Sequence, residues 1–158
     1  MYNAEKSITT HSAKETHDAG KKYIQTVGAD RIFALYGDLG SGKTTFVQGL
    51  AKGLGIKRPI ISPTFVIIRT YKIAYKNLKF FYHIDLYRTE SERDIEGLGI
   101  EEIVNDPQNI VAIEWAEKMG RFLPRKRIDI RFAYLSESKR RITVGNLKSQ
   151  IAKLKTTT

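Results

Sequence analysis

The sequence predicts a mixed α/β fold, in which a partly antiparallel sheet is flanked by helices, and three observations support it. An apolar run over residues 31–36 is followed by a glycine-rich loop and a helix-like stretch over 43–54, the order of a strand–loop–helix unit. Residues 109–114 form a second fully apolar run, which is typical of a buried strand. The chain behind the first unit carries more strand than helix patterns. We therefore expect one α/β domain over residues 1–158.

Turn residues and hydrophobic periodicity indicate the other elements. Ser12 and Glu15 form a capping box that begins a helix, and Gly55 is placed to end the helix over 43–54. The further predicted helices span 12–27, 90–96 and 100–105. The further predicted strands span 64–74, 78–85, 127–135 and 140–144. The first two of these strands are separated by a short turn, which predicts a hairpin.

The composition is that of an ordinary soluble globular protein, with 41% hydrophobic and 28% charged residues. No apolar run approaches the roughly 20 residues that a membrane-spanning helix needs. The first 15 residues lack the apolar centre of a secretory signal. The chain has no cysteine, which excludes disulfides and thiolate metal sites. We expect a cytoplasmic protein without a membrane partner.

The positive charge is concentrated at the C-terminal end. Residues 1–120 hold 16 basic and 15 acidic side chains, whereas residues 121–158 hold 11 and 2, a net charge of +9. Two interpretations are open: a solvated basic face, or a docking surface for a polyanion or an acidic partner. The stretch 136–158 carries no motif beyond this charge.

The chemistry-bearing motif is Gly37-Asp-Leu-Gly-Ser-Gly42-Lys43-Thr44, a P-loop. Backbone N–H groups of such a loop converge on phosphate oxygens, and a side chain at the glycine positions would block that approach. The lysine reaches the β- and γ-phosphates and the threonine hydroxyl ligates Mg²⁺. No Asn-Lys-x-Asp tetrapeptide for guanine is present, which favours ATP. The residues expected to bind ATP are Asp38, Leu39, Gly40, Ser41, Gly42, Lys43, Thr44 and Thr45.

Two carboxylates, Asp85 and Glu114, follow apolar strands and are candidates for the Mg²⁺ or water position of a hydrolytic P-loop site. Each could instead mark the point where a strand meets solvent. Thr64, in the turn Ser62-Pro-Thr-Phe65, belongs either to an ordinary turn or to a switch that senses the γ-phosphate. His83 is interpreted as a packed or hydrogen-bonded strand residue rather than a catalytic base.

Four motifs, in this order and spacing, resemble the bacterial TsaE family. They are Gly37–Thr45, Ser62–Phe65, His83–Arg88 and Ile113–Glu117. The resemblance covers residues 12–135 and implies a P-loop α/β domain with a mixed sheet, slow ATP hydrolysis in isolation, and action with a TsaB–TsaD pair. That assembly attaches a threonylcarbamoyl group to the adenosine beside the anticodon of tRNAs that read codons beginning with A. The TsaE subunit resets the complex between turnovers and does not perform the transfer.

The resemblance also implies a role for each motif residue. Lys43 and its loop hold the phosphates, and Thr44 with Glu114 holds Mg²⁺. Asp85 orients the attacking water or the metal shell, and Thr64 lies in the switch. The family usually has Phe at position 84 and often Pro at position 116, where this chain has Ile and Ala. Both differences keep the acidic residues.

Two other functions remain open on the sequence. A stand-alone P-loop kinase for a small molecule or a nucleotide shares the loop, but 158 residues leave little room for an acceptor site. A module that binds RNA through the basic end has no RRM or KH signature to support it.

Overall fold

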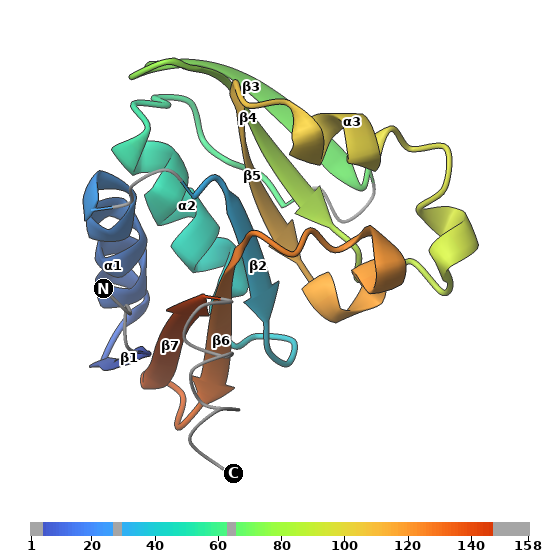
Figure 1. Cartoon of the computed structure of the whole chain (residues 1–158). Helices are drawn as coiled ribbons and strands as arrows, with labels where there is room; N and C mark the ends of the chain where they lie inside the picture. The colour runs from blue at the N-terminus through green and yellow to red at the C-terminus, as the bar shows by residue number, and fades with distance from the viewer. Residues whose placement is uncertain (1–4, 27–29, 63–65, 147–158) are drawn as a thin grey trace, which may run out of the picture.

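The structure, a computed structural model, describes residues 5–26, 30–62 and 66–146. Its centre is a seven-stranded sheet in the order β1-β7-β6-β2-β5-β4-β3 (Figure 1). The strands are β1 Lys6–Thr10, β2 Ile32–Tyr36, β3 Ile68–Tyr75, β4 Leu78–Asp85, β5 Asn109–Glu114, β6 Ile128–Tyr134 and β7 Arg140–Asn146. The mixed sheet with flanking helices confirms the predicted fold class.

The middle of the sheet is parallel and its two edges are antiparallel. Strands β6, β2, β5 and β4 pair in parallel, whereas β1–β7, β7–β6 and β4–β3 pair antiparallel. The carboxyl ends of β2, β5 and β4 therefore lie at one edge of the sheet. The register sets Glu114 beside Leu35 on one side and beside Asp85 on the other. In open α/β sheets, ligands bind outside this edge.

Helices cover both faces of the sheet (Figure 1). On one face lie α1, Ala13–Thr26, and α2, Lys43–Gly53; on the other lie the short elements η1, Glu92–Asp94, α3, Ile100–Asn105, and η2, Ala116–Phe122. Helices α1 and α2 approach closely because Gly49 of α2 lies against the backbone of α1. A Cβ on Gly49 would lie 2.0 Å from the His17 carbonyl oxygen. A larger residue there would push the helices apart.

Alternating side chains of β2 fill two separate cores. Phe33 and Leu35 pack beneath α1 and α2, whereas Ile32 and Ala34 pack against the opposite cluster, which includes Met119 from η2. All residues of β5 are buried, as its unbroken apolar run predicts. The strand that leads into the P-loop is thus fixed from both faces, which gives the loop a rigid base.

Several sequence predictions are confirmed at the level of single elements. The amide of Glu15 donates to Ser12 Oγ at 3.0 Å, so Ser12 caps α1 as predicted, although the Glu15 carboxylate bonds the His11 amide instead of closing on Ser12. Gly55 follows α2 with a φ of +86°. The hairpin forms, with β3 beginning at Ile68; the start predicted at Thr64 lies outside the described residues.

Two elements escaped prediction: β1, a polar edge strand paired with β7, and η2, a 3-10 segment interrupted at Gly120. In the described part of the chain, no helix combines the length and the apolar character that crossing a membrane requires.

Candidate functional site

The loop between β2 and α2 turns tightly on its glycines. Gly42 has a φ of +102°, a backbone conformation in which an L side chain is strained. Gly37 has no room for a side chain, since its Cβ would lie 2.7 Å from the Phe132 carbonyl oxygen. Helix α2 begins directly at Lys43 and has no side-chain cap. Its first N–H groups are therefore available to an anion.

Lys43 lies folded across this loop and is 4% exposed. Its Nζ atom donates to the carbonyl oxygens of Gly37 at 2.5 Å and Asp38 at 3.0 Å. The same atom lies 4.2 Å from the centre of the Trp115 ring, a cation–π contact. Burial lowers the pKa of Lys43, and nearby carboxylates, first of all Glu114, oppose that shift. The ammonium is thus held by the hollow that the loop forms.

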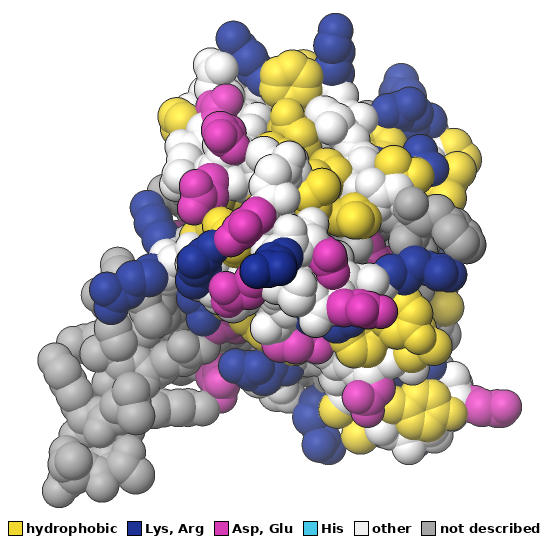
Figure 2. All heavy atoms as spheres, turned by 90° about the vertical axis from the view of Figure 1, so that its right-hand side faces the viewer, with side chains coloured by type: hydrophobic (Ala, Val, Ile, Leu, Met, Phe, Trp, Pro, Cys, Tyr) yellow, Lys and Arg dark blue, Asp and Glu magenta, His cyan; other side chains and the backbone are white. Residues whose placement is uncertain are grey.

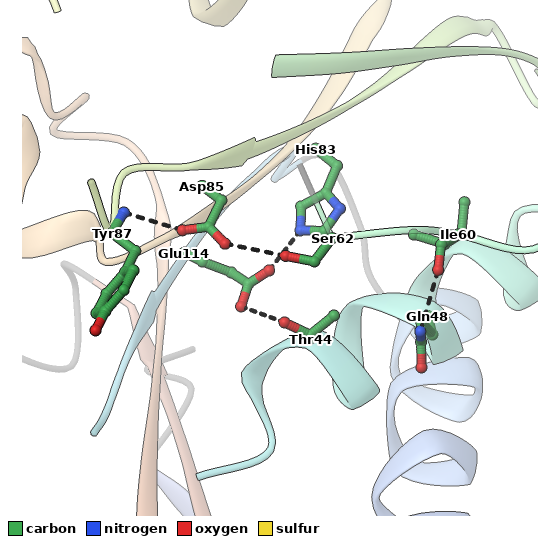
Figure 3. A network of polar contacts seen from close by, with 8 residues as sticks. All are labelled: Thr44, Gln48, Ile60, Ser62, His83, Asp85, Tyr87 and Glu114. Carbon is green, nitrogen blue, oxygen red and sulfur yellow. Dashed lines mark hydrogen bonds and ion pairs between the residues drawn. The ribbon is translucent and has the colours of Figure 1, made fainter. Parts of the chain in front are cut away.

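Glu114, the last residue of β5, has a hydrogen-bond partner at each carboxylate oxygen (Figure 3). Thr44 donates its hydroxyl to Oε1 at 2.7 Å, and His83 Nε2 lies 2.5 Å from Oε2. Both His83 and Glu114 are buried. The sheet order β4-β5-β2 creates this chain of contacts, because it sets the ends of three strands that are distant in sequence beside one another.

Asp85 ends β4 beside Glu114, and its carboxylate bonds Ser62 and Tyr87 (Figure 3). Its Oδ2 accepts the Ser62 hydroxyl at 3.2 Å, and its Oδ1 accepts the Tyr87 amide at 3.0 Å. The preceding stretch is tied to α2, since Gln48 donates to the Ile60 carbonyl oxygen at 3.1 Å. Residues 60–62, which precede residues 63–65, are therefore anchored to both the sheet and helix α2.

Two pockets lie on either side of the P-loop and share Gly40. A cavity of about 160 Å³ is lined by Leu39, Gly40, Lys43, Thr44, Ser62, Asp85, Tyr87, Glu114 and Trp115. A cavity of about 120 Å³ is lined by Ser12, Ala13, Thr16, Gly40, Gly42, Thr45, Glu137, Ser138 and Arg140. Arg140 closes the second pocket: its Nη2 donates to the Gly40 carbonyl oxygen at 3.0 Å, and its guanidinium lies over the Tyr134 ring.

The donor set at Thr44 and Glu114 fits a magnesium ion. Mg²⁺ takes oxygen ligands and usually binds one or two protein carboxylates together with phosphates and water. Here a hydroxyl and a carboxylate oxygen are hydrogen-bonded to each other, and both residues line the cavity of about 160 Å³. Within the described residues, no group of three or more His, Cys, Asp or Glu side chains could hold a metal ion by itself. A metal at this point would complete its shell from phosphates and water.

Comparison with known proteins identifies the family. The model of the threonylcarbamoyl adenosine biosynthesis protein TsaE matches residues 10–142. The chain belongs to the TsaE family. The TsaE protein of Bacillus subtilis is 42% identical over 140 residues, which cover 87% of this chain and 85% of that protein. The TsaE protein of Nostoc is 40% identical, over 82% of this chain and 79% of its own length.

A solved structure agrees with this membership. The crystal structure of Bacillus subtilis YdiB superposes with a TM-score of 0.75 at 30% identity, over 98% of this chain and 93% of that chain. The family's role in tRNA threonylcarbamoyladenosine biosynthesis therefore applies to this chain.

The structure brings together most residues that the TsaE motifs predict. Lys43, Thr44, Asp85 and Glu114 line one cavity together with Leu39 and Gly40, and Gly42 and Thr45 line the other. Asp38 takes part through its carbonyl oxygen, and the buried Ser41 donates its amide to that oxygen at 3.1 Å. Thr64 lies outside the described residues. These assignments stay predictions of function, now with defined positions.

Sequence reasoning missed two contributors to the site. Arg140 gave no signal except its charge, because its contact with the loop depends on the position of the β6–β7 turn. Tyr87 lies in the TsaE motif that begins at His83, and its ring packs 5.2 Å from that of Trp115. Trp115 has a φ of +58°, and its ring lies against the Lys43 ammonium.

Proposed function

We propose that this chain is an ATPase that binds Mg-ATP at the P-loop and supports tRNA threonylcarbamoyladenosine formation in the cytoplasm, together with a TsaB–TsaD-like complex. One observation supports it above all: Lys43 and the hydrogen-bonded pair Thr44 and Glu114 line one cavity at the glycine-rich loop. A phosphate-binding cation and a Mg²⁺-type oxygen pair are the two groups that ATP hydrolysis requires at such a loop.

The two pockets divide the nucleotide between them in this proposal. The β- and γ-phosphates lie in the cavity of Lys43, where the ammonium exchanges loop carbonyl oxygens for phosphate oxygens. Thr44 and Glu114 hold Mg²⁺, which neutralises charge on the phosphates when bound. The second pocket adjoins Thr45, on the α-phosphate side of the loop, and we assign it to the adenosine.

Asp85 is the candidate for orienting the attacking water. Its carboxylate lines the phosphate cavity, and Tyr87 and Ser62 hold its two oxygens in place. A fixed acceptor next to the γ-phosphate position contributes through orientation, and no covalent intermediate with the protein is needed. Thr64 follows two residues after Ser62 and remains the proposed γ-phosphate sensor.

Incubation with γ-labelled ATP and candidate acceptors tests hydrolysis against the kinase alternative. Hydrolysis releases the label as inorganic phosphate in the presence of Mg²⁺, whereas a kinase transfers it to an acceptor. A labelled acceptor together with no free phosphate would overturn the proposal. We expect the release to be slow for the isolated chain and faster with the TsaB–TsaD-like complex.

Trp115 provides a direct optical test, since it is the single tryptophan of the chain. Nucleotide binding moves the Lys43 ammonium, which lies 4.2 Å from the indole, so we expect the emission of Trp115 to change as Mg-ATP saturates the site. Calorimetry provides the independent measure of saturation. Emission that stays flat while calorimetry reports saturation would contradict the proposed movement of Lys43.

The basic C-terminal quarter is partly engaged within the protein. Arg121 pairs with Glu92 and Glu96, and Arg127 bonds Asp129 at 2.8 Å. On the face that carries α3, η1 and η2, acidic and basic side chains are interspersed around apolar patches (Figure 2). Arg125 and Lys126 are exposed at the turn before β6. We take these two neighbouring side chains as candidates for contact with tRNA or with an acidic protein.

We expect the double variant Arg125→Glu/Lys126→Glu to weaken binding to the tRNA-loaded TsaB–TsaD-like complex and to leave intrinsic ATP hydrolysis unchanged. Each phosphate contact adds roughly 0.7–0.9 to the slope of log affinity against log salt. The measurement is affinity at two salt concentrations, with Lys57→Glu, an exposed lysine elsewhere on the surface, as the control. Affinities equal to wild type at both concentrations would make this region a solvated face.

A further inference from the structure

His83 is a fully buried histidine whose ring contacts Glu114, the proposed metal-site carboxylate, at the oxygen that does not bond Thr44. It lies in β4, in register with Arg69 of β3 and Ala112 of β5, and is 0% exposed. Its Nε2 atom is 2.5 Å from Glu114 Oε2, while Glu114 Oε1 accepts the Thr44 hydroxyl. His83 does not line either pocket at the P-loop. Among the described residues, its side-chain hydrogen bond to the site is the one with Glu114 (Figure 3).

We propose that His83 is a positioning residue that fixes the plane of the Glu114 carboxylate, so that one oxygen faces Thr44 and the Mg²⁺ position. This inference rests on the proposed function. The terminal torsion of a glutamate side chain is broad and has no single preferred angle. A hydrogen bond to the far oxygen selects one angle. Partners of this kind typically change metal affinity by 10–100-fold when they are removed.

The hydrogen-bond pattern indicates which ring nitrogen carries the proton. An ionised carboxylate only accepts hydrogen bonds, so Nε2 is the donor. The other ring nitrogen, Nδ1, is buried and has no hydrogen-bond partner among the described residues. Buried N–H groups without an acceptor are rarer in proteins than under-satisfied buried acceptors, which favours a bare lone pair on Nδ1. We therefore assign the ring the Nε2–H tautomer.

This tautomer separates positioning from catalysis. The Nε2 atom is engaged by Glu114, and His83 lines neither cavity at the P-loop. A general base must reach the proton that it removes, directly or through one water. His83 meets neither condition, so its effect on the reaction passes through the orientation of Glu114.

The experiment compares three variants by calorimetric titration of a non-hydrolysable ATP analogue at increasing Mg²⁺. Mg²⁺ should raise the affinity for the analogue, and we expect His83→Leu to need roughly 10-fold or more Mg²⁺ to reach half of that increase. Its affinity for the analogue in EDTA should stay at the wild-type value. His83→Gln should restore part of the effect, since its amide can donate from nearly the same place. Phe81→Leu is the control, because Phe81 is equally buried in β4 but packs against Tyr71 in the other core.

The outcomes separate this inference from the proposed function. Unchanged Mg²⁺ dependence in both His83→Leu and Phe81→Leu would overturn the positioning role. Glu114→Gln tests the site itself: if it also leaves the Mg²⁺ dependence unchanged, the proposed metal site fails. If Glu114→Gln abolishes the Mg²⁺ dependence and His83→Leu does not change it, the metal site is supported and the proposed role of His83 is wrong.

A spectroscopic measurement on the wild-type protein guards against a variant that does not fold. With three histidines in the chain, ¹⁵N NMR of the imidazoles can be assigned by His11→Gln and His17→Gln. We expect His83 to show a slowly exchanging proton on Nε2 whose shift changes when Mg²⁺ and the analogue bind. A proton on Nδ1, or a signal indifferent to Mg²⁺, would contradict the inference.

Discussion

Lys43→Ala is expected to reduce ATP hydrolysis by at least about 100-fold, the scale of losing one preorganised charge-stabilising donor in a buried site. The Nζ atom is the cationic donor inside the loop, and burial removes the water that would otherwise screen it. Alanine cannot replace its charge-assisted contact with the β- and γ-phosphates. The measurement is release of inorganic phosphate at saturating Mg-ATP.

Lys52→Ala is the matched control for this variant. Lys52 lies in the same helix but is exposed, and it lines neither of the two pockets. It should hydrolyse ATP at the wild-type rate. Hydrolysis by Lys43→Ala at that rate would refute the assignment of the P-loop as the catalytic site.

Glu114→Gln is expected to remove most of the effect of Mg²⁺ on nucleotide affinity. The substitution keeps the volume of a side chain that is 2% exposed, yet it removes the negative charge facing Thr44. Mg²⁺ depends on such charged oxygens, which a neutral amide replaces poorly. Calorimetry with and without Mg²⁺ measures the difference directly. Affinity in EDTA should change little.

Asp85→Asn provides the contrast, since Asp85 lines the same cavity but its carboxylate bonds Ser62 and Tyr87. We expect it to slow hydrolysis more than it changes Mg²⁺-dependent binding. If Glu114→Gln binds Mg-ATP as wild type does, Glu114 is not part of the metal site. If the two variants behave identically, their proposed division of roles is wrong.

Most elements of the fold could be predicted from local sequence patterns. Strands β2 and β5 are predicted within a residue because an apolar run bounded by polar residues specifies a buried strand without reference to its partners. β1 could not be predicted in this way. Its sequence Lys-Ser-Ile-Thr-Thr is exposed except at Thr10, and it forms a strand because it pairs with β7 at the other end of the chain. Pairing of this kind overrides local propensity.

The site shows the same division. The P-loop and the two carboxylates could be predicted from sequence. The loop has a continuous motif, and each carboxylate directly follows an apolar run. The contact of His83 with Glu114 requires the strand order β4-β5-β2, which no local pattern contains. Arg140 reaches Gly40 across 100 positions, and its charge alone does not distinguish it from its basic neighbours.

A crystal structure of the chain with Mg²⁺ and a non-hydrolysable ATP analogue tests the central claim most directly. We expect the phosphates to lie against the N–H groups of residues 38–45, with Lys43 Nζ released from the Gly37 and Asp38 carbonyl oxygens. The metal should lie between Thr44 and Glu114, and the adenosine should occupy the pocket beside Arg140. A nucleotide bound elsewhere, with Lys43 still folded on its own loop, would contradict the proposed ATPase site.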